Sequence, residues 1–200
     1  MITLPFRKLV LPVIAMALVV VASNILVQYS FEPFGLGDYL TWGAFTYPVS
    51  FLVTDLTNRR YGPKIARELV AVGFVIAVAL SIWLATPRIA LASGTAFLVG
   101  QLLDISVFNR LRRQTWWRAP LVGSVIGSAL DTALFFSLAF AGDPDMSGPV
   151  ALFGTEIPLW QSLALFDFGV KMLIALLALL PYGALMSVIL PMERAEKTAA

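Results

Sequence analysis

The residues with the most chemical potential in this sequence are nine polar side chains that interrupt long apolar stretches. They are Asn24, Gln28, Asp55, Gln101, Asp104, Asn109, Asp131, Asp167 and Lys171. A charged side chain at the centre of a membrane helix costs about 2.5–3.5 kcal/mol on insertion scales, so such residues face the interior of a helix bundle or a water-filled cavity. Carboxylates accept hydrogen bonds, and amides both donate and accept them. The set is therefore suited to binding a polar solute along a route through a membrane.

Helical spacing places six of these residues in three pairs, because residues three or four positions apart share one face of a helix. The pairs are Asn24 with Gln28, Gln101 with Asp104, and Asp167 with Lys171. Two of the pairs also have a purely structural interpretation. Asn24 and Gln28 are able to supply hydrogen bonds between helices. Asp167 and Lys171 are able to neutralise each other.

The other aspartates differ in their neighbours along the chain. Asp55 lies one helical turn before Arg59, so an ion pair at a helix end is one interpretation and a functional carboxylate is the other. Asp131 has no basic residue within one helical turn. A membrane carboxylate without a nearby counter-ion is costly to insert, so Asp131 is the strongest functional candidate.

The composition excludes several kinds of chemistry. The 200 residues include no cysteine and no histidine, which rules out disulfide bonds and thiolate nucleophiles and removes the most common metal ligand and general base. We therefore expect no catalytic residue, no metal and no cofactor. The net charge of +2 and the pI near 9.1 are explained by membrane insertion, so direct binding of nucleic acid is not expected.

Transmembrane helices are the elements that must position these residues. Hydrophobic residues make up 59% of the chain and charged residues 13%, with a mean hydropathy of +0.85, whereas soluble domains have about 25% charged residues. A span takes about 20 residues, so residues 1–200 have room for six spans in one domain and for no separate soluble domain. The predicted spans of this all-α membrane bundle are about 9–29, 39–57, 69–85, 89–108, 120–140 and 159–190.

The basic residues predict the orientation, since cytoplasmic loops are enriched in Lys and Arg. Twelve of the 14 basic residues lie before the first span, between the second and third, between the fourth and fifth, or after the sixth. This distribution predicts a multi-pass protein of the inner (cytoplasmic) membrane with both termini in the cytoplasm. Two halves of three spans would have opposite orientation, which leaves a 3+3 inverted repeat open.

Backbone features predict irregularities within the bundle. Pro48 has no amide proton, so the second span is predicted to break there. Tyr47, Trp42 and Phe45 precede the break; they offer a stacking surface for a planar ligand, with core packing and interface anchoring as the alternative. Pro181 indicates a kink or tilt in the last span.

Small residues and turn formers mark two further features. Gly123, Gly127 and Ser128 predict a face of the fifth span that a neighbouring helix approaches closely, and Gly123 with Gly127 fits the GxxxG pattern. Residues 142–158 are rich in Gly, Pro and acidic residues without periodicity. They are predicted to form an irregular outer loop or partial lid.

Three segments resemble one known family. The segment 47–62, YPVSFLVTDLTNRRYG, resembles the signature of the queuosine precursor transporter family, also called the vitamin uptake transporter family. Two later segments are similar to the same family: GQLLD at 100–104 with Phe108, and SALDT at 128–132 with Phe135, Phe136 and Phe140. The resemblance extends from the second to the fifth predicted span, and the first motif is specific.

The resemblance implies a six-helix inner-membrane importer that is not an enzyme. Its implied substrate is 7-cyano-7-deazaguanine, with the 7-aminomethyl relative left open, for queuosine modification of transfer RNA. Kinship with the substrate-binding subunits of energy-coupling-factor vitamin transporters is also implied. By carry-over of the matching positions, Asp55, Gln101, Asp104 and Asp131 become the leading site residues.

The chemistry of a deazaguanine suits these side chains. A carboxylate accepts its adjacent N–H donors, an amide or ammonium donates to its carbonyl oxygen, and its flat bicycle stacks on an aromatic ring. Our hypothesis is that Asp131 or Asp104 holds the guanine-like edge and that Asp55 lies at the cytoplasmic gate. The candidate substrate-binding residues are Asn24, Gln28, Tyr47, Asp55, Gln101, Asp104, Asp131 and Lys171.

Other functions remain open at this point. The first alternative is a substrate-binding subunit of an ATP-driven vitamin uptake system, and a remote one is a non-catalytic membrane assembly subunit that uses its basic loops. An intramembrane aspartyl protease is disfavoured, because its paired motifs are absent and the Gly-x-Gly-Asp sequence at 35–38 precedes the second span. The driving force and a homo-oligomeric state are left open.

Overall fold

The chain is mostly helical. The computed structural model describes residues 6–37, 39–152 and 154–189. The helices are α1 (Phe6–Leu26), α2 (Gly43–Thr46), α3 (Val49–Tyr61), α4 (Pro63–Leu84), α5 (Pro87–Leu111), α6 (Arg118–Phe140) and α7 (Leu159–Leu185), with a 3-10 turn η1 (Pro33–Gly35). Between α6 and α7 lie the strands β1 (Pro149–Leu152) and β2 (Thr155–Pro158).

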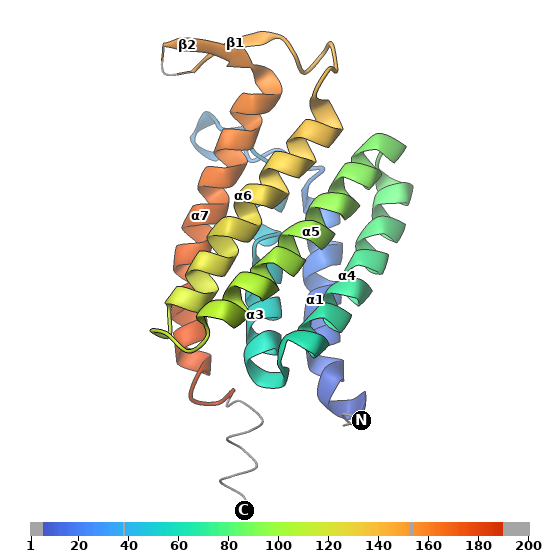
Figure 1. Cartoon of the computed structure of the whole chain (residues 1–200). Coiled ribbons are helices and arrows are strands. Elements are labelled where there is room, and N and C mark those ends of the chain that lie inside the picture. Colours follow the sequence, from blue (N-terminus) through green and yellow to red (C-terminus); the bar gives the residue numbers. More distant parts are fainter. Residues whose placement is uncertain (1–5, 38, 153, 190–200) are drawn as a thin grey trace, which may run out of the picture.

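The long helices run side by side as a bundle (Figure 1). Helix α5 packs against α4 on one side and against α6 on the other, α7 packs against α6, and α1 packs against α4. The short helix α3 contacts α1, α4, α5, α6 and α7. Because α3 contacts every long helix, its polar side chains lie in the interior of the bundle.

The surface of the bundle fits a lipid environment. Five of the described helices, α1, α4, α5, α6 and α7, are long and apolar enough to cross a membrane. Their outward faces carry large apolar side chains, such as Leu18, Val75 and Leu180, which are 65–73% exposed. Apolar patches of this extent are rare on monomeric soluble proteins. The chain is therefore a multi-pass, all-α membrane protein, apart from the small strand pair.

The second predicted span is interrupted, as its proline predicts. Helix α2 ends at Thr46 and α3 begins at Val49, and Pro48 lies between them. On the far side of the break, the amides of Ser50 and Phe51 donate to carbonyls three residues back, at 3.0 and 3.1 Å. Helices α2 and α3 together cover the predicted range 39–57 only in part, so the six-span count and the inverted repeat stay predictions.

The connection between α6 and α7 is more regular than predicted. Strands β1 and β2 pair antiparallel with Val150 opposite Ile157, and Gly154 near the turn has a φ of +82°, which favours glycine. The prediction of an irregular loop was wrong for Pro149–Leu152 and Thr155–Pro158. Backbone hydrogen bonds hold this strand pair together. Its side chains do not clearly alternate between polar and apolar, so sequence patterns do not reveal the strands.

The proline in the last helix does not end it, and the kink or tilt at Pro181 stays a prediction. Helix α7 begins at Leu159 and continues as a helix through Pro181 to Leu185. The predicted end of the last span, at residue 190, lies outside the described residues.

Glycines bring α5 and α6 into close contact, as the GxxxG pattern predicts. A Cβ atom on Gly127 would lie 3.0 Å from the carbonyl oxygen of Gly100, and one on Gly123 would lie 2.5 Å from Oδ1 of Asp104. A Cβ on Gly100 would lie 3.0 Å from the Cβ of Asp131. Since real Cβ atoms are not found at the shortest of these distances, only glycine allows the two backbones to approach this closely. The close approach places Asp104 and Asp131 at the α5–α6 interface.

Candidate functional site

A large cavity occupies the half of the bundle that carries the strand pair. Its volume is about 740 Å³, within the roughly 300–1,000 Å³ typical of small-molecule sites. It is lined by the ends of α1 and α4, the segment 37–47, the start of α5, the second half of α6 and the start of α7. Most of its wall is apolar, so the few polar groups in it are able to orient a ligand.

The main polar group of the cavity is a buried cluster around Lys171 of α7. Its ammonium nitrogen lies 2.8 Å from Oδ2 of Asp131 and 2.5 Å from Oδ2 of Asp167, and it donates to the hydroxyl of Thr132 at 2.9 Å. Thr132 in turn donates to Asp167 at 2.8 Å. The i, i+4 pair of Asp167 and Lys171 expected from sequence is therefore present, and Asp131 of α6 extends it.

Tyr47 completes the cluster from the broken second span. Its hydroxyl donates to Oδ1 of Asp131 at 2.8 Å, and the ammonium of Lys171 lies 5.4 Å from the centre of its ring. Each carboxylate oxygen of Asp131 thus has a partner, yet a carboxylate oxygen accepts more than one hydrogen bond. One lysine facing two aspartates leaves an excess of carboxylate acceptors at the cavity wall.

Asn24 and Gln28 line the same cavity from α1. The hydroxyl of Ser81 on α4 donates to Oδ1 of Asn24 at 3.0 Å, while the amide of Asn24 donates to the carbonyl of Val20 at 2.9 Å. Gln28 donates to the backbone carbonyl of Asn24 at 3.2 Å and is exposed. The structural interpretation of Asn24 as a link between helices is confirmed. The printed bond of Gln28 stays within its own segment, and its contact with substrate stays a prediction.

Gln101 lies outside the cavity, in the interface between α3 and α5. Its side chain is fully buried; the amide oxygen accepts from Thr54 at 2.7 Å and the amide nitrogen donates to Ser50 at 2.8 Å. Both ends of the amide are therefore engaged within the protein. In this arrangement Gln101 joins two helices, and its direct contact with substrate stays a prediction.

Asp55 and Asp104 also lie outside the large cavity and face each other. Asp55 of α3 is 2% exposed, Asp104 of α5 is 0% exposed, and their carboxyl groups are close enough to share a hydrogen bond. Among the described residues, neither forms an ion pair. The ion pair of Asp55 with Arg59 that sequence spacing left open is thus not found among the described residues, although the two share one face of α3.

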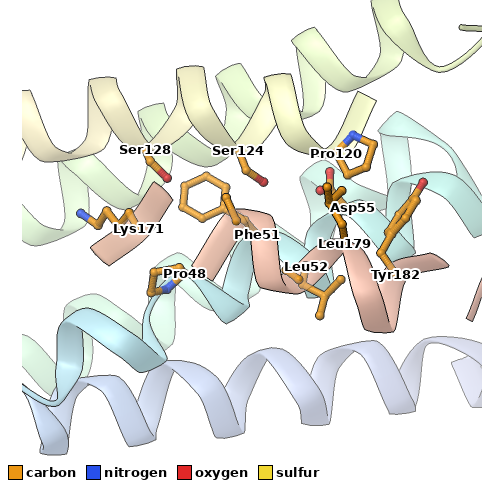
Figure 2. A pocket seen from close by; sticks show the side chains of 12 residues that line it. Pro48, Phe51, Leu52, Asp55, Pro120, Ser124, Ser128, Lys171, Leu179 and Tyr182 are labelled. Carbon is orange, nitrogen blue, oxygen red and sulfur yellow. The ribbon is translucent and has the colours of Figure 1, made fainter. Parts of the chain in front are cut away.

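A narrow crevice connects the two groups of charged residues. It runs between α3, α6 and α7, with Lys171 at one end and Asp55 and Tyr182 at the other (Figure 2). Its volume of about 10 Å³ is close to the roughly 10–15 Å³ that one water molecule needs. The structure therefore brings Tyr47, Asp131 and Lys171 together at the cavity, and it places Asp55 and Asp104 beyond a constriction.

Aromatic side chains form part of the cavity wall. Phe135, Phe136 and Phe140 of α6 line it and pack on one another with ring centroids 5.1–5.9 Å apart. Trp42 and Phe45, by contrast, pack against Phe31 with centroids 4.8 and 4.6 Å apart and do not line the cavity. Their packing outside the cavity agrees with the structural alternative of core packing and interface anchoring, and Trp42 is 43% exposed.

Three residues in or beside the cavity were not among the candidate substrate-binding residues. Thr132 and Asp167 belong to the Lys171 cluster, and Ser81 holds Asn24. Asp167 was one of the nine polar residues and a partner for Lys171, but it was not a candidate substrate-binding residue. Ser81 and Thr132 are hydroxyl residues, which are common in membrane helices. What distinguishes them is the partner that each contacts on another helix, and that depends on the rotation of its own helix.

Comparisons with known proteins agree on one family. The family described as "Putative vitamin uptake transporter" matches residues 41–86 and 80–186. A protein of Escherichia coli (strain K12) named "Queuosine precursor transporter" is 37% identical over 195 residues, which cover 86% of this chain and 84% of the relative. A "Probable queuosine precursor transporter" of Haemophilus influenzae is 36% identical over 206 residues, covering 86% and 83%. One of Bacillus subtilis is 26% identical over 82% of this chain and 77% of its own. No solved structure matches the chain.

Proposed function

This chain belongs to the vitamin uptake transporter family, and we propose that it imports queuosine precursors, with 7-cyano-7-deazaguanine as a substrate. The observation that carries the proposal is the cluster of Tyr47, Asp131, Asp167 and Lys171 in the wall of a cavity of about 740 Å³. The names of the relatives supply the substrate class. The cluster supplies polar groups that suit this class of substrate.

The cluster offers both kinds of hydrogen-bonding group that a guanine-like edge needs. Asp131 and Asp167 present carboxylate oxygens that accept from adjacent N–H groups, and such charge-assisted bonds are among the stronger ones in proteins. Lys171 is a donor suited to a ring carbonyl. Asp131 and Asp167 already hold Lys171 in place. A bound base would therefore contact side chains that are ordered before it binds.

The rest of the cavity suits a flat ring. Phe135, Phe136 and Phe140 offer ring faces and edges, and Phe97 and Tyr39 lie on other parts of the wall. Aromatic pairs in offset or edge-to-face geometry contribute about 0.5–1.5 kcal/mol beyond burial. The proposal therefore places the base between the α6 aromatic residues and the Lys171 cluster.

Complementation tests the proposed function. Cells that can neither synthesise nor import the precursor are supplied with this gene and with 7-cyano-7-deazaguanine at nanomolar to micromolar concentration, and queuosine in their transfer RNA is measured. We expect queuosine to reappear, also in a host without an energy-coupling ATPase module. Absence of queuosine with the protein present in the membrane would contradict the substrate, and restoration only with the ATPase module would favour the binding-subunit alternative.

The basic residues support an orientation with both termini in the cytoplasm. The last turn of α3 carries Arg59 and Arg60, and the first turn of α4 carries Lys64. These turns and the α5–α6 connection, with Arg112 and Arg113, lie at the same end of the bundle as the start of α1 and the end of α7 (Figure 1). Cytoplasmic loops are enriched in such residues. We therefore place the protein in the inner membrane, with the large cavity open toward the outer side.

The absence of cysteine makes this orientation easy to test. A single cysteine at Ser147, an exposed residue between α6 and α7, is expected to react with a membrane-impermeant maleimide on intact spheroplasts. A matched cysteine at Gln114, an exposed residue between α5 and α6, is expected to react only after permeabilisation. The reverse pattern would invert the proposed orientation. The chain without introduced cysteine is the blank for both measurements.

A further inference from the structure

The facing carboxyl groups of Asp55 and Asp104 have no partner that explains their burial. Oδ1 of Asp55 and both carboxyl oxygens of Asp104 are buried and accept no hydrogen bond from any described residue. The two ion pairs of the described chain both involve Lys171, at the other end of the crevice. Buried carboxylates are normally paired or multiply hydrogen-bonded, so this pair requires another explanation.

The surroundings of the pair leave little room for a hidden partner. Gly123 of α6 packs so closely that a Cβ there would lie 2.5 Å from Oδ1 of Asp104. On α3, the amide nitrogen of Asn58, one turn after Asp55, donates to the carbonyl of Ile105 at 3.4 Å and is therefore engaged.

The remaining titratable and charged neighbours are on α7, α3 and the end of α5. Tyr182 of α7 lies near Asp55, and Arg59 and Arg112 lie around the Tyr182 hydroxyl. Neither arginine forms an ion pair with Asp55 or Asp104 within the described residues. The pair of carboxyl groups therefore faces one phenol and two arginines that do not contact it directly.

A single shared proton explains how these two carboxyl groups are buried without other partners. Two adjacent carboxylates in a medium of low dielectric constant repel each other strongly and do not both stay ionised. One proton between them removes a charge and creates an O–H donor, which satisfies an oxygen on each residue. No change in the protein backbone is needed.

The crevice allows a proton, but not a bicyclic base, to reach the pair. It leads from Lys171 to Asp55 past the hydroxyls of Ser124 and Ser128 (Figure 2). Its volume is about 10 Å³, whereas the cavity above it has about 740 Å³. A water molecule together with the two serine hydroxyls is able to relay a proton over this path.

We propose that Asp55 and Asp104 are a proton site, which takes up one proton from the outer cavity and releases it to the cytoplasm for each precursor imported. On binding, a hydronium ion in the cavity loses its proton to a carboxylate of the pair and becomes water; on release the O–H bond breaks and the proton passes to cytoplasmic water. The coupling rests on the proposed transport function, whereas the proton-holding state of the pair does not.

Infrared spectroscopy of the purified protein tests the proton-holding state without any transport. The wild type at pH 7 is expected to show a carboxylic acid C=O band that shifts on exchange into D₂O, at a pH where exposed carboxyl groups are ionised. The double variant Asp55→Asn/Asp104→Asn is expected to lose this band, and the control Glu68→Gln, at an exposed residue of α4, is expected to keep it. A wild type without the band, or a double variant that retains it, would overturn the proposal.

Transport in proteoliposomes tests the coupling. Accumulation of radiolabelled 7-cyano-7-deazaguanine is compared with exchange counterflow, which needs no driving force. A pH gradient of one unit, acidic outside, is expected to raise accumulation by the wild type up to about tenfold for one coupled proton. In Asp104→Asn the ratio of gradient-driven to gradient-free accumulation is expected to fall to one. Counterflow without a gradient effect in the wild type, or stimulation by sodium alone, would overturn the coupling, whereas no counterflow at all would contradict the transport function instead.

Discussion

Replacing Lys171 by methionine is expected to abolish uptake and to destabilise the folded chain by about 3–5 kcal/mol, the range for removing one partner of a buried ion pair. Lys171 is 4% exposed and holds both Asp131 and Asp167. Methionine has a similar length but no charge, so both carboxylates would remain buried beside each other without a counter-ion. The cavity would also lose its strongest donor.

Two measurements separate these effects. Uptake is measured by restored queuosine in transfer RNA, and stability by the midpoint of thermal unfolding in detergent. The matched control is Lys64→Met, at an exposed position near the start of α4, which is expected to change neither. Wild-type uptake by Lys171→Met would remove the cluster from the proposed site.

A neutral version of the cluster distinguishes folding from binding. The variant Lys171→Met/Asp131→Asn/Asp167→Asn carries no charge in the cluster, and replacing a whole ion-pair group is often neutral for stability. We therefore expect its unfolding midpoint to return toward that of the wild type. Uptake is expected to remain absent, because the carboxylate acceptors and the ammonium donor for the base are gone. Recovery of uptake together with stability would show that the cluster serves folding alone.

Gly127→Ala in α6 adds only one methyl group, yet it is expected to lower the free energy of unfolding by about 1–3 kcal/mol, the range for overpacking. The added methyl would lie 3.0 Å from the Gly100 carbonyl oxygen and 2.9 Å from a ring carbon of Phe51. A backbone atom cannot move aside as the end of a side chain can, so α5 and α6 must separate.

Gly169→Ala in α7 is the matched control, because no atom lies within 4 Å of a Cβ at that position. In a helix interior this change is expected to be neutral or stabilising, since alanine has the higher helix propensity by about 1 kcal/mol. Unfolding midpoints of both variants in the same detergent provide the comparison. Equal stability of the two variants would contradict a tight α5–α6 contact.

The separation of α5 from α6 also bears on the proton site. Asp104 and Asp131 both lie at this interface, and the backbone of Gly100 and Gly123 packs against them. A shift of either helix would therefore displace the Asp55–Asp104 pair and the Lys171 cluster together. Substitutions at the charged residues therefore test each site separately, whereas substitutions at the glycines would disturb both sites together.

Local patterns were enough to predict the long helices. Long apolar stretches predicted the helices, Pro48 predicted the break between α2 and α3, and the GxxxG pattern predicted the close face of α6. These features depend on a residue's own stretch of chain, where composition and spacing act directly. The strand pair at 149–158 was missed, because it is held by backbone hydrogen bonds that side-chain patterns do not record.

Partners across the bundle could not be predicted in the same way. Asp131 was selected because it has no basic neighbour in sequence, yet its counter-ion is Lys171, 40 residues later on α7. Asp55 was paired with Arg59 as an alternative, yet it faces Asp104 on α5. Which helix lies beside which, and at what rotation, depends on packing among all the helices.

The tertiary structure therefore divides the nine polar residues of the apolar stretches into separate groups. The sequence by itself determined that they lie in apolar helices, where an idle charge is too costly to keep. Only the tertiary structure decided that Tyr47, Asp131 and Lys171 meet at a wide cavity, that Gln101 joins α3 to α5, and that Asp55 and Asp104 meet beyond a crevice. The physical reason is that a residue's place in an apolar helix depends on its own stretch of sequence. A binding site depends on contacts between several helices.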